Sequence, residues 1–272
     1  MGGEGRERRF GRLTSAEDDG LLSYGSYLQI PQLLELQQLR SDPPVHDELL
    51  FIVVHQAYEL WFRQLLFELE AIRDRLFAGD TGRARHYLVR VKAIERVLIE
   101  HIEVLRSMSP QDFLDFRSLL TPASGFQSIQ FREVEFVSGL KDARFLDDLA
   151  ASPGERDRLR RRLNEPSVWD GFCALLEAHG LPMPPGDGRD DEAVRTASLV
   201  TMARERPELF AVSEGLLDHD EGIATWRSAH VLMVERQIGA KTGTGGSSGV
   251  SYLRSTLGKR CFPELWSLRS AL

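Results

Sequence analysis

Long apolar stretches with helical spacing dominate this chain, and the longest of them surrounds a single histidine. From Asp47 to Glu70 the sequence reads DELLFIVVHQAYELWFRQLLFELE, with His55 near its middle. This run is too long for one strand and is apolar on nearly every face, so it predicts a buried central helix. Its first turn holds two acids, as the helix dipole favours, and we expect a glycine C-cap at Gly79.

A histidine in such an apolar wall has two interpretations. It is either a core imidazole bonded to a backbone carbonyl or a polar group that points into an apolar cavity. His230 lies in a second apolar helix, which Pro207 is expected to open. Two such helices can enclose a flat cofactor, with one histidine bound to iron and the other on the open side. The separation of 230 − 55 = 175 residues does not establish that arrangement by itself.

Helical spacing and capping signals predict the other elements. An apolar stripe predicts a helix over 82–106, and Ser109 followed by Pro110 predicts a short helix that contains Arg117. Further expected elements are a helix after the turn at 122–125, an arginine-rich helix from 153 with a solvated face, and a loop at 181–191. We find no strand pattern, so the predicted fold class is all-α, a helical bundle.

Composition narrows the class of protein. The 272 residues suit a globular protein, and the net charge of -7 with a pI near 5.6 excludes an obvious nucleic-acid footprint. No run is long enough to span a membrane. Cys173 and Cys261 lie in apolar runs and are expected to be buried thiols, so we predict a cytoplasmic protein. The expected organisation is a mobile segment at 1–20 and a single domain at 21–272.

A glycine-rich stretch follows the His230 helix. Residues 243–249 read GTGGSSG, but they follow a helix instead of a strand, and no GK[ST] closes them. Both the Walker and the dinucleotide-binding fingerprints therefore fail. The prediction that remains is a mobile loop that can bring backbone amides and small hydroxyls close to a ligand.

Four motifs occur in an order that resembles one known family. SYGSYLQIPQLL, HDELLFIVVHQAYELW, FRSLLTPASGFQSIQFR and IGAKTGTGGSSG extend over nearly the whole chain, from about Leu21 to the C-terminus. Together they resemble tryptophan 2,3-dioxygenase. The resemblance implies a homotetramer with heme b, in which His230 is the proximal iron ligand and His55 is the distal, catalytic histidine that meets the indole nitrogen. It also implies that Phe51, Ser124 and Gly125 contact the heme.

The same resemblance assigns the substrate contacts. It implies that Arg117 grips the carboxylate of L-tryptophan or a close analogue, and that Thr244 contacts its amino-acid end. A guanidinium suits this task because its fork of N–H groups matches a carboxylate. The remaining implied contacts come from the pocket wall and from the N-terminal segment of a neighbouring subunit: Phe51, Leu120 and Ser124 from the wall, and Tyr24 and Tyr27 from the neighbour.

Four positions depart from the pattern usual in this family. Tyr58 stands where serine is usual, Ile102 where tryptophan is usual, Ala229 replaces an arginine, and Ala240 lies in a changed loop sequence. The favoured function is insertion of both atoms of dioxygen into the indole ring, which gives N-formylkynurenine. Two alternatives stay open at this point: monooxygenation to a 2-oxindole, as in relatives from specialised metabolism, and a non-catalytic heme carrier or sensor.

Overall fold

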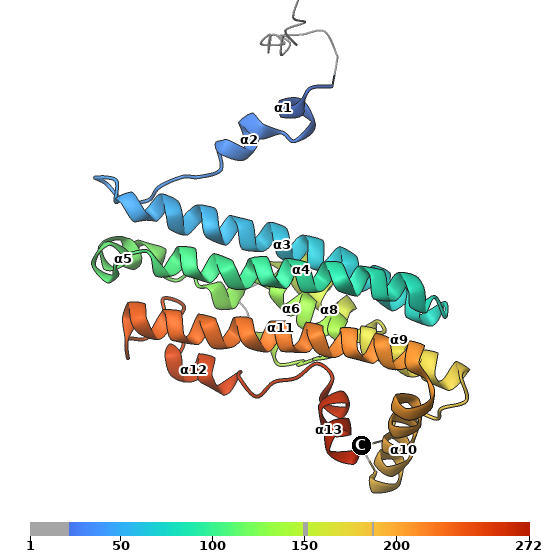
Figure 1. Cartoon of the computed structure of the whole chain (residues 1–272). Coiled ribbons are helices and arrows are strands. Elements are labelled where there is room, and N and C mark those ends of the chain that lie inside the picture. The colour runs from blue at the N-terminus through green and yellow to red at the C-terminus, as the bar shows by residue number, and fades with distance from the viewer. Residues whose placement is uncertain (1–21, 149–151, 187) are drawn as a thin grey trace, which may run out of the picture. The chain divides into compact units, whose positions relative to one another are not determined.

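The structure is a computed structural model that describes residues 22–148, 152–186 and 188–272. Every regular element in these residues is a helix, so the predicted all-α fold class is confirmed (Figure 1). The chain divides into two compact units, one up to Gln38 and the other Leu39–Leu272. The predicted mobile segment at 1–20 lies outside the described residues, and the single domain at 21–272 stays a prediction.

The first unit contains two short helices, α1 (Tyr24–Tyr27) and α2 (Ile30–Leu34). Ser23 caps α1 through a reciprocal capping box with Ser26, and a proline occupies the first turn of α2. The side chains of Tyr24 and Tyr27 are 79% and 71% exposed. Neither tyrosine is therefore held by packing within its own unit.

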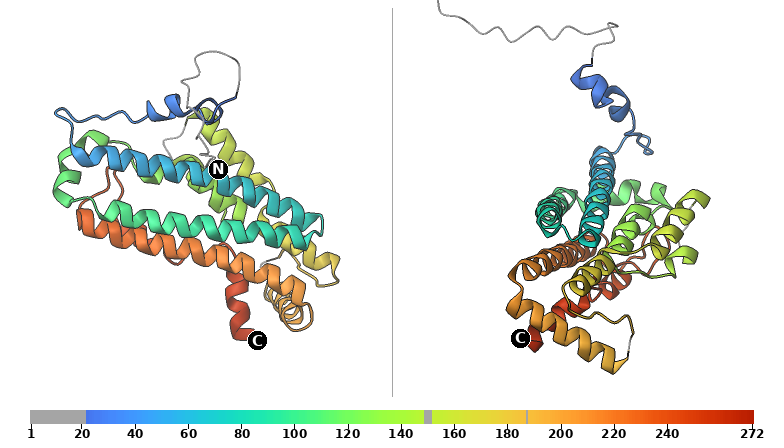
Figure 2. Two further views of the ribbon diagram at one scale, coloured as in Figure 1. Left: turned by 45° about the horizontal axis from the view of Figure 1, so that its top comes forward. Right: turned by 90° about the vertical axis from the view of Figure 1, so that its right-hand side faces the viewer.

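Three long helices form the frame of the second unit: α3 (His46–Phe77), α4 (Thr81–Arg106) and α11 (Pro207–Ile238). Helix α4 packs against both α3 and α11, as two views agree (Figures 1 and 2). The predicted central helix and the helix opened by Pro207 are confirmed. Gly79 follows the end of α3 with a φ of 73°, a conformation that glycine adopts without strain.

One side of α3 is not buried within the chain. Leu49, Val53, Leu60 and Phe67 are 47%, 46%, 60% and 67% exposed. Their spacing of four and seven residues places them on one face of the helix. The expectation that α3 is buried on nearly every face is therefore wrong along this stripe, because apolar composition does not reveal which faces find a partner within one chain.

Shorter helices surround the three long ones. Helix α6 packs on α3 and on α8, and α9 also packs on α3. The capping signals at Ser109 and Ser152 are confirmed, since each side chain accepts a hydrogen bond from the first turn of its helix. The bounds of the remaining helices are α5 (Pro110–Arg117), η1 (Ser118–Leu120), η2 (Gly125–Gln127), α6 (Ile129–Ser138), α7 (Phe145–Asp148), α8 (Pro153–Asn164), α9 (Val168–Ala178), α10 (Arg189–Glu205), α12 (Val250–Ser255) and α13 (Pro263–Ala271).

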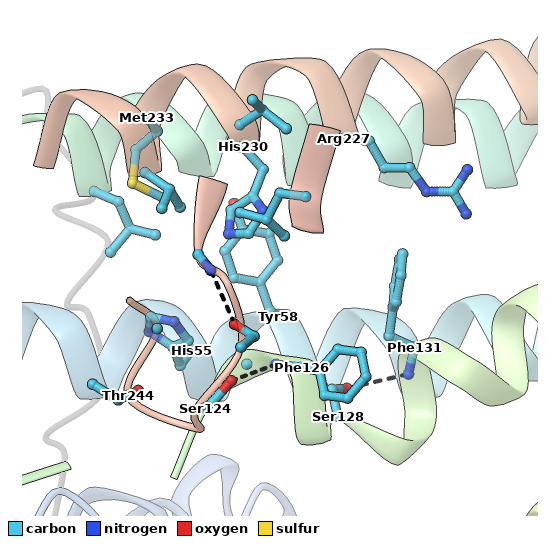
Figure 3. Close-up of a pocket in the computed structure, with 18 of the residues that line it drawn as sticks. His55, Tyr58, Ser124, Phe126, Ser128, Phe131, Arg227, His230, Met233 and Thr244 are labelled. Atoms are coloured by element: carbon cyan, nitrogen blue, oxygen red, sulfur yellow. Dashed lines mark hydrogen bonds between the residues drawn. The ribbon is translucent and has the colours of Figure 1, made fainter. Parts of the chain in front are cut away.

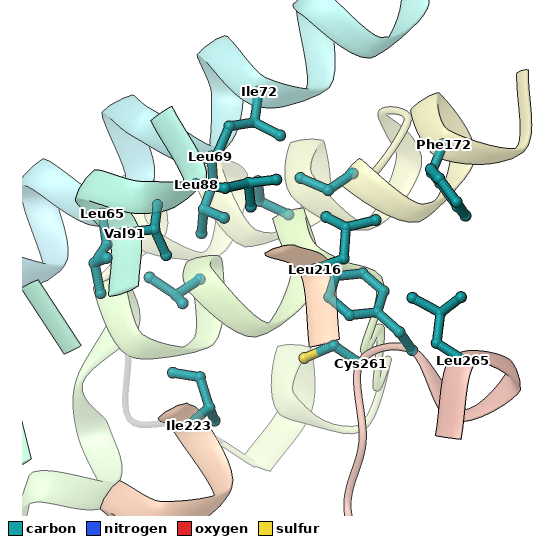
Figure 4. Packing of buried hydrophobic residues seen from close by; sticks show 14 of the residues in the cluster. Leu65, Leu69, Ile72, Leu88, Val91, Phe172, Leu216, Ile223, Cys261 and Leu265 are labelled. Atoms are coloured by element: carbon teal, nitrogen blue, oxygen red, sulfur yellow. The ribbon is translucent and has the colours of Figure 1, made fainter. Parts of the chain in front are cut away.

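The main core extends along α3 from Val54 to Leu76. Leucine, isoleucine, valine and phenylalanine side chains from α3, α4, α9, α11 and α13 interdigitate there (Figure 4). The expectation that arginine-rich α8 is only a solvated face is wrong at Arg162. That side chain is buried and hydrogen-bonds to Glu70, Glu133 and Glu165. Three carboxylates around one guanidinium offset the cost of burying its charge.

Candidate active site

A cavity lined mainly by apolar side chains separates α3 from α11 near the start of α3 (Figure 3). Helices α5, α6 and α12 and the loop after α11 complete its wall. Seven of the predicted site residues line it: Phe51, His55, Arg117, Ser124, Gly125, His230 and Thr244. Residues from five separate stretches of the chain thus meet at one place, although their individual roles stay predictions.

Three predicted site residues are not among those that line the cavity within its own unit. Leu120 belongs to η1 and does not line the cavity. Tyr24 and Tyr27 belong to α1, in the unit that ends at Gln38. The predicted contributions of these three residues to substrate binding stay predictions.

His55 combines the two interpretations of a histidine in an apolar helix. Its Nδ1 lies 2.7 Å from the carbonyl oxygen of Phe51, one turn earlier in α3, while the ring lines the cavity. Burial lowers the pKa of His55, so the ring is neutral near pH 7. In a neutral ring whose Nδ1–H donates to a carbonyl, Nε2 is the acceptor. The carbonyl of Phe51 therefore leaves Nε2 as a hydrogen-bond acceptor for a ligand.

His230 borders the cavity from α11 without a polar partner. Within the described part of the chain, neither of its ring nitrogens has a hydrogen-bond partner, and the half-buried residue lines the cavity. Burial, helped by the nearby His55, lowers the pKa of His230 to about 4. Its ring stacks on Trp226, with the centroids 5.2 Å apart and the planes 6° apart. A neutral imidazole with free nitrogens is suited to bind a metal.

One end of the cavity carries charge that the sequence analysis missed. Glu135 accepts hydrogen bonds from Arg132 at 2.6 Å and from Arg227 at 2.5 Å, and all three side chains are buried. Among the described residues the Nε of Arg132 has no hydrogen-bond partner, and its guanidinium lies 4.2 Å from the centre of the Phe145 ring. Two guanidiniums with one carboxylate leave a net positive end. The sequence signal for this buried charge is an arginine, Arg132, within the phenylalanine-rich stretch FQSIQFREVEF.

The glycine-rich loop after α11 closes over the turn before η2. Arg117 donates a hydrogen bond to the carbonyl oxygen of Thr242, and the Thr244 hydroxyl donates to the carbonyl of Ala123 at 2.6 Å. A Cβ atom at Gly245 would lie 2.7 Å from the Cβ of Ser124, closer than side chains tolerate. Glycine is therefore required for the loop to approach this wall of the cavity.

Of the four departures from the family pattern, only Tyr58 lines the cavity. Its hydroxyl donates to the Leu98 carbonyl of α4 at 2.9 Å, and burial raises its pKa to about 12. Ile102 is buried in the main core, Ala229 is packed at the edge of that core, and Ala240 is exposed. The lining of the cavity is thus less altered than the sequence departures suggest.

Comparison with known proteins supports the motif assignment. A family model described as tryptophan 2,3-dioxygenase matches residues 12–166 and 173–272. The chain belongs to the tryptophan 2,3-dioxygenase family. Relatives named tryptophan 2,3-dioxygenase include one from Nocardioides sp., 54% identical over 94% of this chain and 97% of the relative. Another, from Herpetosiphon aurantiacus, is 48% identical over 92% of this chain and 98% of the relative. A third, from Anaeromyxobacter sp., is 43% identical over 92% of this chain and 96% of the relative.

These matches confirm the predicted resemblance to tryptophan 2,3-dioxygenase at the level of the family. None of the described helices is long and apolar enough to cross a membrane.

Proposed function

We propose that this protein is a heme-dependent dioxygenase that acts on L-tryptophan and converts it to N-formylkynurenine by inserting both atoms of dioxygen across the indole 2,3-bond. Membership of the tryptophan 2,3-dioxygenase family supports this reaction. The observation that carries it is the pair His55 and His230, which line one apolar cavity from separate helices and are both held neutral by burial.

The lining residues fit heme b. His230 offers a neutral nitrogen without a competing hydrogen bond, and Phe51, Ser124 and Gly125 offer an apolar and backbone surface for the flat ring. At the charged end, the partnerless Nε of Arg132 offers a donor for a carboxylate of the cofactor. Heme b, when bound, supplies the iron chemistry that activates dioxygen. His230 would therefore be the residue that binds the iron.

His55 orients the substrate in this proposal. Its Nδ1–H is committed to the Phe51 carbonyl, so its Nε2 accepts a hydrogen bond from the indole N–H. The lowered pKa keeps that nitrogen unprotonated over the physiological range, which preserves its acceptor character. An indole held in this way presents its 2,3-bond to the centre of the cavity. His55 thus fixes the geometry of the reacting bond.

Arg117 and Thr244 hold the amino-acid end. The Arg117 side chain lines the cavity, and among the described residues its guanidinium hydrogen-bonds to the Thr242 carbonyl, a neutral acceptor that a carboxylate can replace. Thr244 lies in the same loop, so the loop and the substrate are held together. The apolar wall, which includes Phe51, Phe113 and Phe131, excludes water from the reacting atoms.

The two alternative functions lack support. The curated relatives bear the name of a dioxygenase, and Ile102, Ala229 and Ala240 lie away from the cavity lining. We expect purified protein with hemin, a reductant, tryptophan and isotope-labelled dioxygen to form a ring-opened product with two labels, detected by mass spectrometry. A single label in an intact indolinone ring would contradict dioxygenation, and heme binding without oxygen uptake would indicate a carrier.

We extend the proposal to a cytoplasmic homotetramer in which the segment bearing Tyr24 and Tyr27 completes a neighbour's cavity. Two sets of exposed apolar side chains support association: those of α1 and α2, and the α3 stripe that contains Leu60 and Phe67. A chain without residues 1–28 should then lose substrate affinity more than heme affinity. Light scattering and kinetics test this, and a fully active monomeric truncation would contradict it.

A further inference from the structure

The ring of Trp226 is the neighbour that sets the position of the His230 imidazole. The two rings lie one turn apart on α11 and are parallel within 6°. Three aromatic side chains hold Trp226 in turn. Phe131 lies 5.0 Å from it, Tyr58 lies 6.0 Å away at 74°, and Phe62 lies 6.3 Å away at 85°, all measured between ring centres. Since interiors are close-packed, movement of these rings must move Trp226.

Tyr58 differs from the two phenylalanines because it is anchored to another helix. It extends from α3 toward α11 (Figure 3), and its hydroxyl donates to the Leu98 carbonyl of α4 at 2.9 Å. The side chain is 6% exposed, so water does not compete for this bond. The Tyr58 ring is therefore fixed at both ends, by the backbone of α3 and by that of α4.

We propose that Tyr58 is a positioning residue for the axial histidine: the hydrogen bond to Leu98 fixes its ring edge-on against Trp226, and Trp226 in turn fixes the plane of His230. This inference rests on the proposed function for its consequence, since the orientation of an axial imidazole affects its bond to iron. The aromatic contacts themselves exist without the cofactor.

The connection joins all three long helices through two side chains. Leu98 lies on α4, Tyr58 on α3, and Trp226 and His230 on α11. A small displacement of α4 relative to α3 would thus reach the His230 ring without any change in the residues that touch the substrate. Packing against the rings of Phe131, Tyr58 and Phe62 holds the Trp226 indole in place.

The decisive variant is Tyr58→Phe, which keeps the ring and removes the anchor. Tyr87→Phe is the matched control, because Tyr87 is a half-buried tyrosine on α4 that does not line the cavity. With hemin as the probe, we expect Tyr58→Phe to weaken binding by about 2- to 10-fold. We also expect it to shift the iron–histidine stretching band of the ferrous protein in resonance Raman spectra, while Tyr87→Phe leaves both unchanged.

A cofactor-free measurement separates this inference from the proposed function. In protein without heme, labelled on histidine rings, the His230 NMR signal should broaden or shift in Tyr58→Phe but not in Tyr87→Phe. Unchanged His230 signals and an unmoved stretching band would overturn the positioning role, even if thermal stability fell. Wild-type protein that fails to bind hemin would instead overturn the proposed function, and the NMR comparison would still decide the role of Tyr58.

Discussion

Two histidines on α11 lie 230 − 219 = 11 residues apart, about three turns, yet their surroundings are opposite. His219 is 1% exposed, and its Nδ1 lies 2.5 Å from a Glu95 oxygen while its Nε2 lies 2.9 Å from the Ser138 hydroxyl. His230 has no hydrogen-bond partner among the described residues and borders a cavity. Both ring nitrogens of His219 thus have polar partners, whereas those of His230 remain available to a ligand.

The electrostatic consequences differ in the same way. Burial opposes protonation of His219, but the Glu95 carboxylate outweighs it and raises the pKa of this histidine. At His230 burial, helped by the nearby His55, lowers the pKa to about 4. Burial alone thus does not distinguish a structural histidine from a ligand. What differs between these two histidines is the Glu95 carboxylate beside His219.

The largest expected effect comes from exchanging each histidine for alanine. Loss of a side chain that hydrogen-bonds to a metal ligand weakens metal binding about 10- to 100-fold. His230→Ala removes the proposed ligand itself, so it should weaken hemin binding at least about 100-fold. His219→Ala should keep the Soret band but lower the free energy of unfolding by about 3–5 kcal/mol, because Glu95 loses its partner. Hemin titration and urea unfolding measure these effects. Equal heme loss in both variants would remove the distinction.

A smaller effect should separate a cavity-facing arginine from a surface one. Arg117→Ala should raise KM for tryptophan by an amount equivalent to about 2–4 kcal/mol, with heme content unchanged. Arg160, exposed on α8 and paired with Asp157, is the matched control, and Arg160→Ala should leave KM at the wild-type value. Steady-state kinetics decide this, and an unchanged KM in Arg117→Ala would place its guanidinium outside the substrate site.

The smallest expected effect is a pH dependence from the His219–Glu95 pair. A raised pKa at His219 means that the folded protein holds this proton more tightly than the unfolded chain. The resulting stability is fully present below the unfolded pKa of about 6.5 and is lost as pH rises through the folded pKa. Burial also raises the pKa of Glu95, which acts in the same direction. Urea unfolding from pH 6 to 9 should therefore show a decline that is smaller in His219→Gln, which keeps only the contribution of Glu95.

The sequence predicted the frame of the fold because its signals are local. Apolar spacing and the capping residues at Ser109, Ser152 and Pro207 placed the starts of three helices correctly. Helix α10 was not predicted, because its apolar residues do not gather on one face. Helix α9 was missed although Ser167 and Asp170 form a capping box at its start, a signal that was present in the sequence.

Motifs identified site residues that carry recognisable chemistry. They did not identify residues whose role depends on a partner far away in the sequence. Arg227 and Glu135 meet although they are 227 − 135 = 92 residues apart. His219 finds Glu95 in the same way, across 124 residues. Neither pairing leaves a local pattern in the sequence. The exposed stripe of α3 was mispredicted for a related reason, since burial depends on what packs against a helix.

The hydrogen bond from Arg117 to the Thr242 carbonyl has a consequence for ligand selectivity. Under the proposed role of Arg117, an incoming group competes for the guanidinium with a neutral acceptor and can displace it. A carboxylate can do so because a bond between two charged groups is the stronger one. An indole amine without a carboxylate would leave the loop carbonyl in place. The hydrogen bond between Arg117 and Thr242 therefore favours ligands that carry a carboxylate over amines that lack one.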